Sequence, residues 1–587
     1  MRSGAGLTPV RDAGWQNAPL MAQWLRRPRF TLPAVLMLFT ALAVLVKLDV
    51  WASPLTRFTG SADAEQMMWF LSWPPFAVSH HMNPLLSNYI NYPTGFNLLW
   101  NTTMPALGLL LWPITAIWGA IATYNVIMTA AMALSAFFAF IAIRRYVHND
   151  LAALAGGLLF GFSPAVIAQE YGHAQVAFSA ITIPLTLLIV DELLVRQRLP
   201  TWLMGVLTAA LGVFQFFVFQ EFFATEIMAA LIVAAVLAFM YRPLIRERSR
   251  YVLRSVGIGA ALAALVLAYP IIAIQLGGPD RIHGVIHDPN LFSTDLLNPV
   301  MPTPLALFAP RWVTAISARF SQNPSEADGY IGIPLLVLSL FVVVRYWRVP
   351  VIRVAAVTAV VIGILSLGPH LEIAGHNTKI PLPWWPVSQL PLVGNILPSR
   401  MMYFVYLPLG IGLAFLLDRM WVARRNWIRP VLVAAVALVP LLPSLPFFDN
   451  TLTIPSYFRT SAVEEIPAGA VVYAMPFPQP WAMDPMNWQF ASRMRFRLIG
   501  GYVLGPLATG QDGLQQVANA FAGASPPPAI TPDQRAEFLR EVRSNRVGAV
   551  IVGPVTNQSA AIAFCTDALG SRPHVSDGLA VWVLPSA

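Results

Sequence analysis

The 587-residue sequence has little charge and almost no cysteine. Asp, Glu, Lys and Arg make up 11% of the chain, whereas soluble domains carry about 25%. Hydrophobic residues make up 57%, more than a water-exposed surface can accommodate. The composition therefore predicts a membrane protein with many spans and excludes a disordered chain, a collagen-like fibre and a disulfide scaffold. Cys565 is the single cysteine, so no internal disulfide can form.

Motifs that bind soluble activated substrates are also missing. There is no Walker loop, no Rossmann glycine pattern, no C-x-x-C array and no G-x-S-x-G element. The formal net charge is +9, but the arginines lie in short clusters between apolar runs. Such clusters are typical of membrane-topology determinants and not of a continuous nucleic-acid-binding face. The absences favour a substrate that is already carried in the bilayer.

Eleven apolar runs are candidates for membrane spans, because each is long enough to cross about 30 Å of hydrocarbon. They are residues 31–46, 124–143, 151–168, 176–195, 201–219, 222–241, 253–275, 331–345, 352–368, 401–417 and 430–446. The first run exceeds a typical signal-peptide core and lacks a convincing cleavage site, so we expect it to remain uncleaved. Residues 1–30 before it form a polar, arginine-containing segment that we place in the cytoplasm.

The arginine distribution predicts the orientation of these spans. With a cytoplasmic N-terminus, 21 of the 37 cations fall in the N-terminal segment and inner loops, and seven fall in outer loops before residue 447. This bias agrees with the positive-inside rule. Residues 104–122 are apolar enough to span, but a span there would invert every later loop. We therefore expect a helix lying in the interface, within a large first outer loop over residues 48–123.

Composition changes after the last span. Residues 447–587 contain strand-like runs at 470–475, 547–552 and 579–584, and a charged helical pattern at 532–547. We expect a small α/β domain on the outer, extracytoplasmic face. The sequence thus predicts a polytopic α-helical membrane domain over residues 31–446, followed by this domain.

Several acids are expected at the outer ends of the spans, where carboxylates are costly unless they are paired, hydrated or functional. Asp63 follows the first span in a short loop, and it could deprotonate an incoming hydroxyl as a general base. A solvated or helix-capping carboxylate is the alternative. Glu65 is a second candidate acid, with a first-turn helix charge as its alternative.

Further polar residues are candidates for contacts to a sugar, a phosphate or a metal. Glu170 and His173 lie three apart at the end of one span, and Glu221 lies at the turn between two spans. Each could also be an ordinary interfacial polar group. A His/Glu pair alone does not specify a metal. Arg400 begins a late span on the outer side, where the guanidinium could bind a lipid phosphate, snorkel to the headgroups or pair with a carboxylate.

The order of these features resembles that of the GT-C superfamily of integral-membrane glycosyltransferases, in particular bacterial members with an outer C-terminal α/β domain. The resemblance rests on an acidic pair in the first outer loop, a Trp-rich interfacial stretch, an Arg-Arg cytoplasmic turn, a Ser-Pro…Gly-His outer turn and a late Pro-Ser-Arg: Asp63, Glu65, Arg144, Arg145, Ser163, Pro164, Gly172, His173 and 398–400. It covers about residues 30–446.

The resemblance implies an inverting enzyme, a hexosyl- or pentosyltransferase, in the bacterial inner membrane. It would move a sugar from a polyprenyl-phosphate-linked donor to a glycan, lipid or protein acceptor of the cell envelope. By position, Asp63 matches the first-loop catalytic acid, Glu170 or His173 the second-loop residue, and Arg400 the phosphate-binding cation. Many members use Mg²⁺ or Mn²⁺, but the second-loop acid here is Glu in place of the more usual Asp, so the sequence leaves metal use open. The C-terminal domain, residues 447–587, would bind the acceptor or recognise carbohydrate.

Two other classes of protein share part of this pattern. A transporter or flippase of polyprenyl-linked sugars would tend to show inverted repeats and charges near the bilayer midplane. A non-enzymatic scaffold would not need the clustered acids. Since the acids gather at outer span ends, the sequence favours the transferase.

Overall fold

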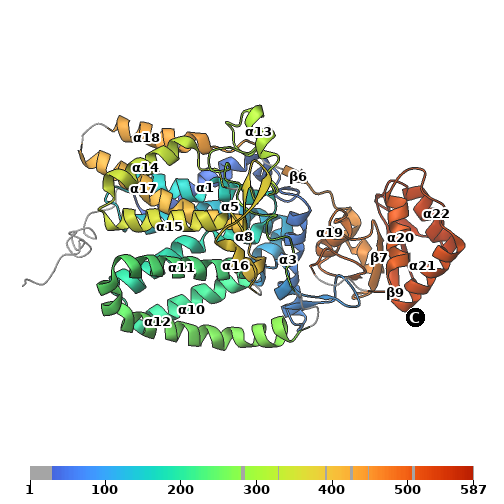
Figure 1. The fold of residues 1–587 in the computed structure, drawn as a ribbon. Coiled ribbons are helices and arrows are strands. Elements are labelled where there is room, and N and C mark those ends of the chain that lie inside the picture. Colours follow the sequence, from blue (N-terminus) through green and yellow to red (C-terminus); the bar gives the residue numbers. More distant parts are fainter. Residues whose placement is uncertain are drawn as a thin grey trace, which may run out of the picture.

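The computed structural model describes residues 30–278, 284–327, 329–390, 393–423, 427–446, 449–504 and 509–585. A bundle of long helices forms the larger part, and a smaller domain built on a β-sheet lies at one end of it (Figure 1). The segment expected in the cytoplasm lies almost entirely outside the described residues.

Seven helical segments in the described ranges are long and apolar enough to cross a membrane. They are Trp112–Ile143 (α5), Asp150–Tyr171 (α6, α7 and η2), Ala174–Arg196 (α8, α9 and η3), Thr201–Val218 (α10), Gln220–Met240 (α11), Arg246–Leu276 (α12 and η4) and Pro398–Trp421 (η6 and α17). The other four expected spans are apolar helices of 10–17 residues: Leu32–Val46 (α1), Ile333–Tyr346 (α14), Pro350–Ser366 (α15) and Ile428–Leu441 (α18 and η7). Length and composition therefore support seven spans, whereas the sequence predicts eleven.

Glycines bring α6 (Asp150–Gly161) close to its neighbours in the bundle. A Cβ on Gly156 would lie 2.7 Å from the carbonyl oxygen of Gly410 on α17 (Met402–Ala423), and a Cβ on Gly161 would lie 2.4 Å from the backbone nitrogen of Ala136 on α5. Small residues of this kind let helix backbones pack directly in membrane proteins. These contacts hold α6 in place, and with it the following turn that carries His173.

The segment expected as the first outer loop, residues 48–123, is an ordered layer over one end of the bundle. It contains the helices Leu48–Trp51 (α2), Ala62–Ser79 (α3), Leu98–Trp100 (η1) and Pro105–Leu110 (α4), and the short strands Arg57–Thr59 (β1), Leu86–Ser87 (β2) and Phe96–Asn97 (β3). Helix α5 begins at Trp112 but is broken at Gly119, where φ is 85°. The pieces before this break each rise about 10 Å, too little to cross a bilayer.

Segments that follow η4 and α15 add a second part of this layer. They contain the helices Arg311–Ser317 (α13) and Trp384–Ser388 (α16), and a hairpin of His370–Ile373 (β4) and His376–Pro381 (β5). The 3-10 helix η6 (Pro398–Met401) leads from this layer into α17 and carries Arg400.

The C-terminal domain is built on a mixed five-stranded sheet with the order β10-β11-β9-β7-β8. Its elements are Val471–Met475 (β7), Asp484–Ala491 (α19), Arg497–Leu498 (β8), Asp512–Ala522 (α20), Pro532–Ser544 (α21), Val547–Val552 (β9), Gln558–Leu569 (α22), His574–Ser576 (β10) and Leu579–Val583 (β11). Strand β7 is buried throughout. Its side chains alternate: Tyr473 and Met475 pack with α20, α21 and α22, whereas Val472 and Ala474 join the core that includes α19 and the bundle.

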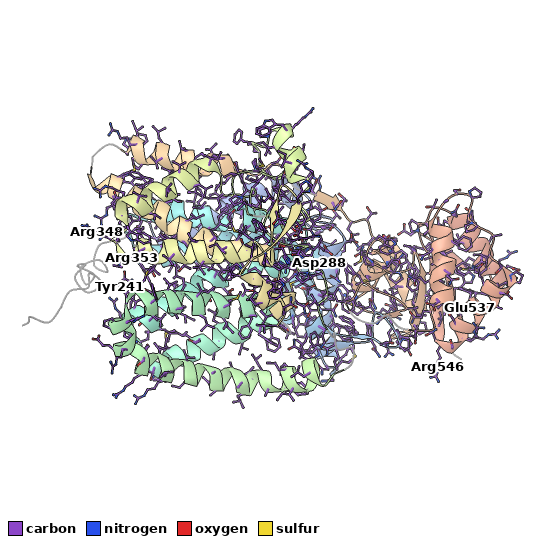
Figure 2. The ribbon with its side chains drawn as sticks, in the orientation of Figure 1. Tyr241, Asp288, Arg348, Arg353, Glu537 and Arg546 are labelled. Carbon is purple, nitrogen blue, oxygen red and sulfur yellow. The ribbon has the colours of Figure 1, made fainter. Side chains whose placement is uncertain are left out.

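Hydrogen bonds fasten this domain to the first outer loop. Strand β1 pairs with Asp449–Thr451 (β6), where Arg57 and Asp449 form an ion pair of 2.5 Å. The buried Trp69 of α3 donates its Nε1–H to Gln489 of α19 at 2.6 Å. The domain that holds Glu537 and Arg546 lies at the opposite end of the bundle from Arg348 and Arg353 (Figure 2).

The close packing at Gly161 can be tested by substitution. Gly161→Ala should lower the apparent melting temperature in detergent, because the new methyl group meets backbone atoms of Ala136 and overpacking of this kind costs about 1–3 kcal/mol. Gly363→Ala in α15 is the matched control, since a Cβ there meets nothing within 4 Å. A Gly161→Ala protein that melts like the control would contradict this account of the α5–α6 contact.

Candidate functional site

Asp63 lies in the first turn of α3, against the turn that carries His173. Ser61 donates its backbone N–H to the carbonyl of Tyr171 at 3.1 Å. Gly60 (φ 116°) and Gly172 (φ 143°) permit this approach, because a Cβ on Gly172 would lie 3.2 Å from Cβ of Asp63. The two turns are therefore pressed together, which sets the carboxylate of Asp63 beside the imidazole of His173.

His173 lies between two carboxylates. Its Nε2 is 3.4 Å from Oδ2 of Asp63, and its Nδ1 is 3.4 Å from Oε1 of Glu326. Nδ1 also donates to Oε1 of Gln169 at 2.8 Å. Burial by itself would lower the pKa of His173, but Asp63 and Glu326 outweigh it and raise the pKa to about 9. The ring is therefore an imidazolium at neutral pH.

The pKa values of the two carboxylates shift downward, in the opposite direction to that of His173. Burial alone would raise the pKa of Asp63, but hydrogen bonds from His173 and Tyr502 lower it below its usual value. Burial likewise opposes ionisation of Glu326, yet Arg400 and His173 lower its pKa to about 2. Both groups are carboxylates at neutral pH, so the site holds paired charges.

Glu326 continues the network to the start of a later span. Arg400 donates from Nε to both oxygens of Glu326 at 3.1 Å and from Nη2 to Oε1 at 2.5 Å. Its Nη1 contacts Oε2 of Glu221 at 2.5 Å, and the guanidinium carbon lies 5.4 Å from the ring centroid of Phe219. Five charged side chains thus form one continuous line: Asp63, His173, Glu326, Arg400 and Glu221.

Glu326 is not among the candidate residues named from the sequence. Glu170 and Glu221 are candidates because each is a carboxylate beside the end of an expected span. The same criterion applies to Glu326, which lies just before the span expected at 331–345. A systematic search for acids at span ends would have found it.

The C-terminal domain contributes a group to the site that sequence reasoning also missed. The hydroxyl of Tyr502 donates to Oδ1 of Asp63 at 2.8 Å. Gln66 holds the tyrosine backbone by donating to its carbonyl at 2.8 Å. Burial and the neighbouring Asp63 raise the pKa of Tyr502 above its usual value, so the phenol stays protonated. No local motif in 447–587 indicates this contact.

Glu65 points away from this line of charges, toward the C-terminal domain. Its carboxyl accepts a hydrogen bond from Asn487 of α19. Burial, helped by the nearby charge of Asp484, raises the pKa of Glu65 to about 7. Glu65 is therefore half-protonated near neutral pH and belongs to the contact between α3 and α19.

Glu170 and His173 do not face one site. Glu170 forms a buried ion pair with Lys47 at 2.7 Å, and Thr59 donates its hydroxyl to the same carboxylate oxygen at 3.0 Å. The helix that would have aligned Glu170 with His173 ends at Tyr171, and Gly172 turns the chain at φ 143°. The two residues therefore point in different directions from one short segment.

The arrangement does not fit a divalent cation. Among the described residues, no group of three or more His, Cys, Asp and Glu side chains is arranged to hold a metal ion. Both ring nitrogens of His173 face carboxylate oxygens as ion-pair partners, and an imidazolium has no lone pair left for a metal. The charge that a metal would supply is present as His173 and Arg400.

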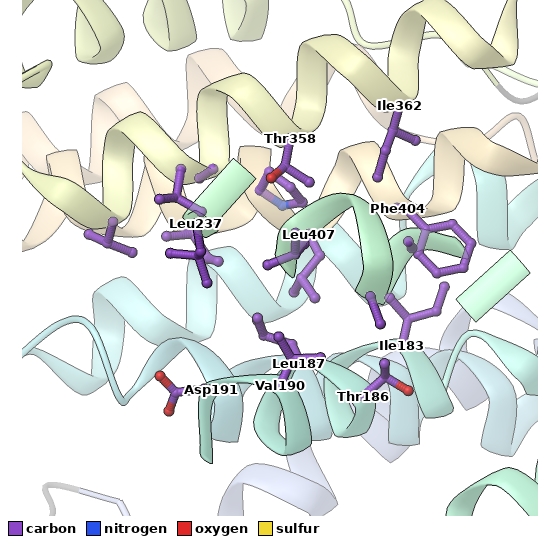
Figure 3. A pocket seen from close by; sticks show the side chains of 18 of the residues that line it. Ile183, Thr186, Leu187, Val190, Asp191, Leu237, Thr358, Ile362, Phe404 and Leu407 are labelled. Atoms are coloured by element: carbon purple, nitrogen blue, oxygen red, sulfur yellow. The ribbon is translucent and has the colours of Figure 1, made fainter. Parts of the chain in front are cut away.

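An apolar cavity of about 120 Å³ lies inside the bundle beyond Arg400. Phe404 and Leu407, one and two turns after Arg400 on α17, form part of its wall, and Ile183, Leu187 and Val190 of α9 (Thr182–Asp191) form another (Figure 3). The remaining lining comes mainly from α11 and α15. The line of charges therefore ends close to a space that suits hydrocarbon.

Comparison with known proteins places the fold. The arabinofuranosyltransferase AftD from Mycobacteria is 15% identical with a TM-score of 0.50, and the match covers 94% of this chain and 40% of that one. The archaeal oligosaccharyltransferase AglB from Archaeoglobus fulgidus, in complex with an inhibitory peptide and a dolichol-phosphate, is 13% identical (TM-score 0.47; 89% and 69% covered). ArnT from Cupriavidus metallidurans is 11% identical (TM-score 0.37; 93% and 97% covered). The likeness to AftD shows that the chain has the GT-C fold, although it spans only two fifths of AftD.

Residues 34–438 match the model of a protein family described as a domain of unknown function, DUF6311, and the chain belongs to that family. No curated protein matches the sequence.

The raised pKa of His173 makes stability depend on pH. The folded pKa of about 9 exceeds the ordinary value of 6.5, so the stabilisation is complete below pH 6.5 and is lost as the pH rises through 9. The loss amounts to on the order of 3 kcal/mol. The apparent melting temperature should therefore fall more steeply between pH 6 and pH 10 for the wild type than for His173→Gln. His376→Gln, an exposed histidine on β5, should keep the wild-type slope; a His173→Gln protein with that same slope would refute the ion pairs.

Proposed function

We propose that this protein is an integral-membrane glycosyltransferase that moves a sugar from a polyprenyl-phosphate-linked donor to a cell-envelope acceptor. The observation that carries the proposal is the line of charges from Asp63 to Arg400. It joins the carboxylate of Asp63 to a guanidinium one helical turn before Phe404, which forms part of the wall of an apolar cavity. A donor with a polar head and a hydrocarbon tail needs both environments at once. The GT-C fold agrees with this assignment.

Asp63 is the proposed general base. The acceptor hydroxyl attacks the anomeric carbon, the bond from that carbon to the phosphate oxygen breaks, and the hydroxyl proton passes to Asp63. A single displacement of this kind inverts the anomeric centre. The hydrogen bond from Tyr502 and the ion pair with His173 hold the carboxylate in place. Because these contacts also lower the pKa of Asp63, the base is ionised and oriented before the acceptor arrives.

Arg400 is the proposed partner of the leaving phosphate. Its guanidinium carries five N–H bonds, and the bonds to Glu221 and Glu326 leave one on each Nη without a partner among the described residues, so these two can meet a phosphate oxygen. A fixed cation is most useful where negative charge develops in the transition state. The prenyl chain would follow α17 into the cavity beside Phe404 and Leu407.

The membrane placement is part of the same proposal. The four shorter apolar helices, α1, α14, α15 and α18 with η7, also cross the bilayer, giving eleven spans, since local thinning and snorkelling side chains accommodate short spans. The bundle end with Arg348 and Arg353 faces the cytoplasm. The C-terminal domain then lies outside the bacterial inner membrane, where it provides Tyr502 and binds the acceptor.

Replacing the base tests the chemistry directly. Asp63→Asn should slow transfer of radiolabelled sugar from polyprenyl-phosphate-sugars to membrane acceptors by about 100-fold or more, because loss of a general base costs 10²–10⁴. Asp49→Asn is the matched control, since Asp49 is exposed and lies outside the site. Equal transfer by Asp63→Asn and the control would remove Asp63 from the mechanism.

The role of the C-terminal domain has its own test. Tyr502→Phe should lower kcat about tenfold with little change in KM, because a hydrogen bond to a charged group is worth about 1.5–3 kcal/mol. Its loss raises the pKa of Asp63, so the acidic limb of the pH–rate profile should move to higher pH. Tyr457→Phe removes a similar hydroxyl contact to Glu465 in the same domain and should change neither. If the acidic limb does not shift in Tyr502→Phe, the C-terminal domain does not influence the ionisation of Asp63.

A further inference from the structure

A second site lies at the far end of α3 from Asp63. Two adjoining cavities, of about 520 and 690 Å³, meet between the C-terminal end of this helix and the C-terminal domain. The residues that line both are Phe76, His80, Arg459, Ala491, Arg493 and Met494. We call this combined space the α3 groove. Ser72, the lining residue of α3 that lies nearest to Asp63 in the sequence, follows it by nine positions, which is about 14 Å of helix, so the groove is separate from the candidate active site.

The polar wall of the groove is cationic. Arg459 and Arg493 are exposed, and within the described part of the chain neither guanidinium makes an ion pair or a hydrogen bond. Arg495, in contrast, is bound to the carbonyls of Ile466 and Glu464. Glu464 is the one carboxylate among the described lining residues. Two unpaired guanidinium groups over one cavity offer ten N–H donors to an anion of phosphate geometry.

The backbone holds one of these arginines in position. Arg493 and Met494 follow α19 with φ of 56° and 58°. This left-handed conformation is unfavourable for residues other than glycine. The turn is kept by the N–H of Met494, which donates to the carbonyl of Gln489 at 2.8 Å, and by burial of the Met494 side chain. This turn places Arg493 in the lining of both cavities.

The other margin of the groove is apolar and exposed. Trp112, Ile117 and Trp118 line it from the first part of α5, and Ile117 and Trp118 are 68% and 57% exposed. The break at Gly119 (φ 85°) turns this part of α5 away from the rest of the helix. Exposed tryptophan and aliphatic side chains beside arginine are typical of a membrane–water interface. The groove therefore has a wall for an anion and a margin for hydrocarbon.

We propose that the α3 groove binds the phosphate-bearing headgroup of a membrane lipid, with Arg459 and Arg493 on the phosphate and the acyl chains along Trp112, Ile117 and Trp118. The planar guanidinium fork matches phosphate oxygens. A soluble phosphate would use the arginines alone, and an uncharged lipid would use the apolar margin alone; the groove offers both together. The site does not depend on the proposed transfer reaction, because it lies at the other end of α3.

Native mass spectrometry of the full-length protein in detergent tests the proposal, because it measures the lipid adducts that the protein retains. Phosphatidylglycerol is the probe, diacylglycerol tests the chains without the phosphate, and glycerol phosphate tests the phosphate without the chains. Arg459→Gln/Arg493→Gln should weaken phosphatidylglycerol binding about tenfold or more, as expected for lost charge-assisted hydrogen bonds. Arg540→Gln/Arg543→Gln, which removes two exposed arginines from α21, should bind it as the wild type does.

Each alternative outcome overturns the proposal in a different way. Equal adducts on the two double variants would remove the arginines from lipid binding. Binding of diacylglycerol as tight as that of phosphatidylglycerol would show that the phosphate is not recognised, and equal binding of glycerol phosphate would identify a soluble ligand instead. Thr460→Glu adds a negative charge at an exposed lining residue whose side chain makes no capping hydrogen bond to the following helix, and it should also weaken the phosphatidylglycerol adduct. The readout needs no turnover, so it is independent of sugar transfer.

Discussion

The pairing of five buried or half-buried charges is the constraint on which the end of the bundle that meets the C-terminal domain depends. Three carboxylates and two cations alternate from Asp63 through His173, Glu326 and Arg400 to Glu221. A single buried charge is costly, and removing one partner of a buried pair leaves the other uncompensated. Since the five groups come from five distant parts of the chain and the pairs stabilise only when complete, the network requires all of these parts to be in position at once.

Close backbone contacts make that geometry possible. The turns at Gly60 and Gly172 touch without side chains between them, and the helices around Gly156 and Gly161 pack at backbone distance. These contacts fix the position of His173 relative to Asp63. A second, independent charge pair, Lys47 with Glu170, joins the end of the first helix to the same turn. The turn is therefore held on both sides, by one pair that serves the candidate site and by another that is fully buried.

The C-terminal domain packs against the helical bundle and also contributes a residue, Tyr502, to the candidate site. The alternating side chains of β7 face α20, α21 and α22 on one side and the core shared with the bundle on the other. Hydrogen bonds of Gln489 and Tyr502 extend this contact to α3. Both ends of α3 thus meet the domain, and each end borders a different chemistry: a carboxylate network at Asp63, and the α3 groove with Arg459 and Arg493 beside Ser79. One helix lying across the end of the bundle organises both.

The sequence by itself determined the helical membrane character of this chain, because apolar runs and the content of charge are local properties. It also identified Asp63, His173, Glu221 and Arg400 as residues of interest, since a polar group at the end of an apolar run is visible without a fold. Only the tertiary structure decided which of these groups meet. The partnership of Glu326 with Arg400, the diversion of Glu170 to Lys47, and the contact of Tyr502 with Asp63 each join segments that are far apart in the chain. Charge pairing acts through space and leaves no periodic signal in the sequence, and for that reason packing alone could reveal it.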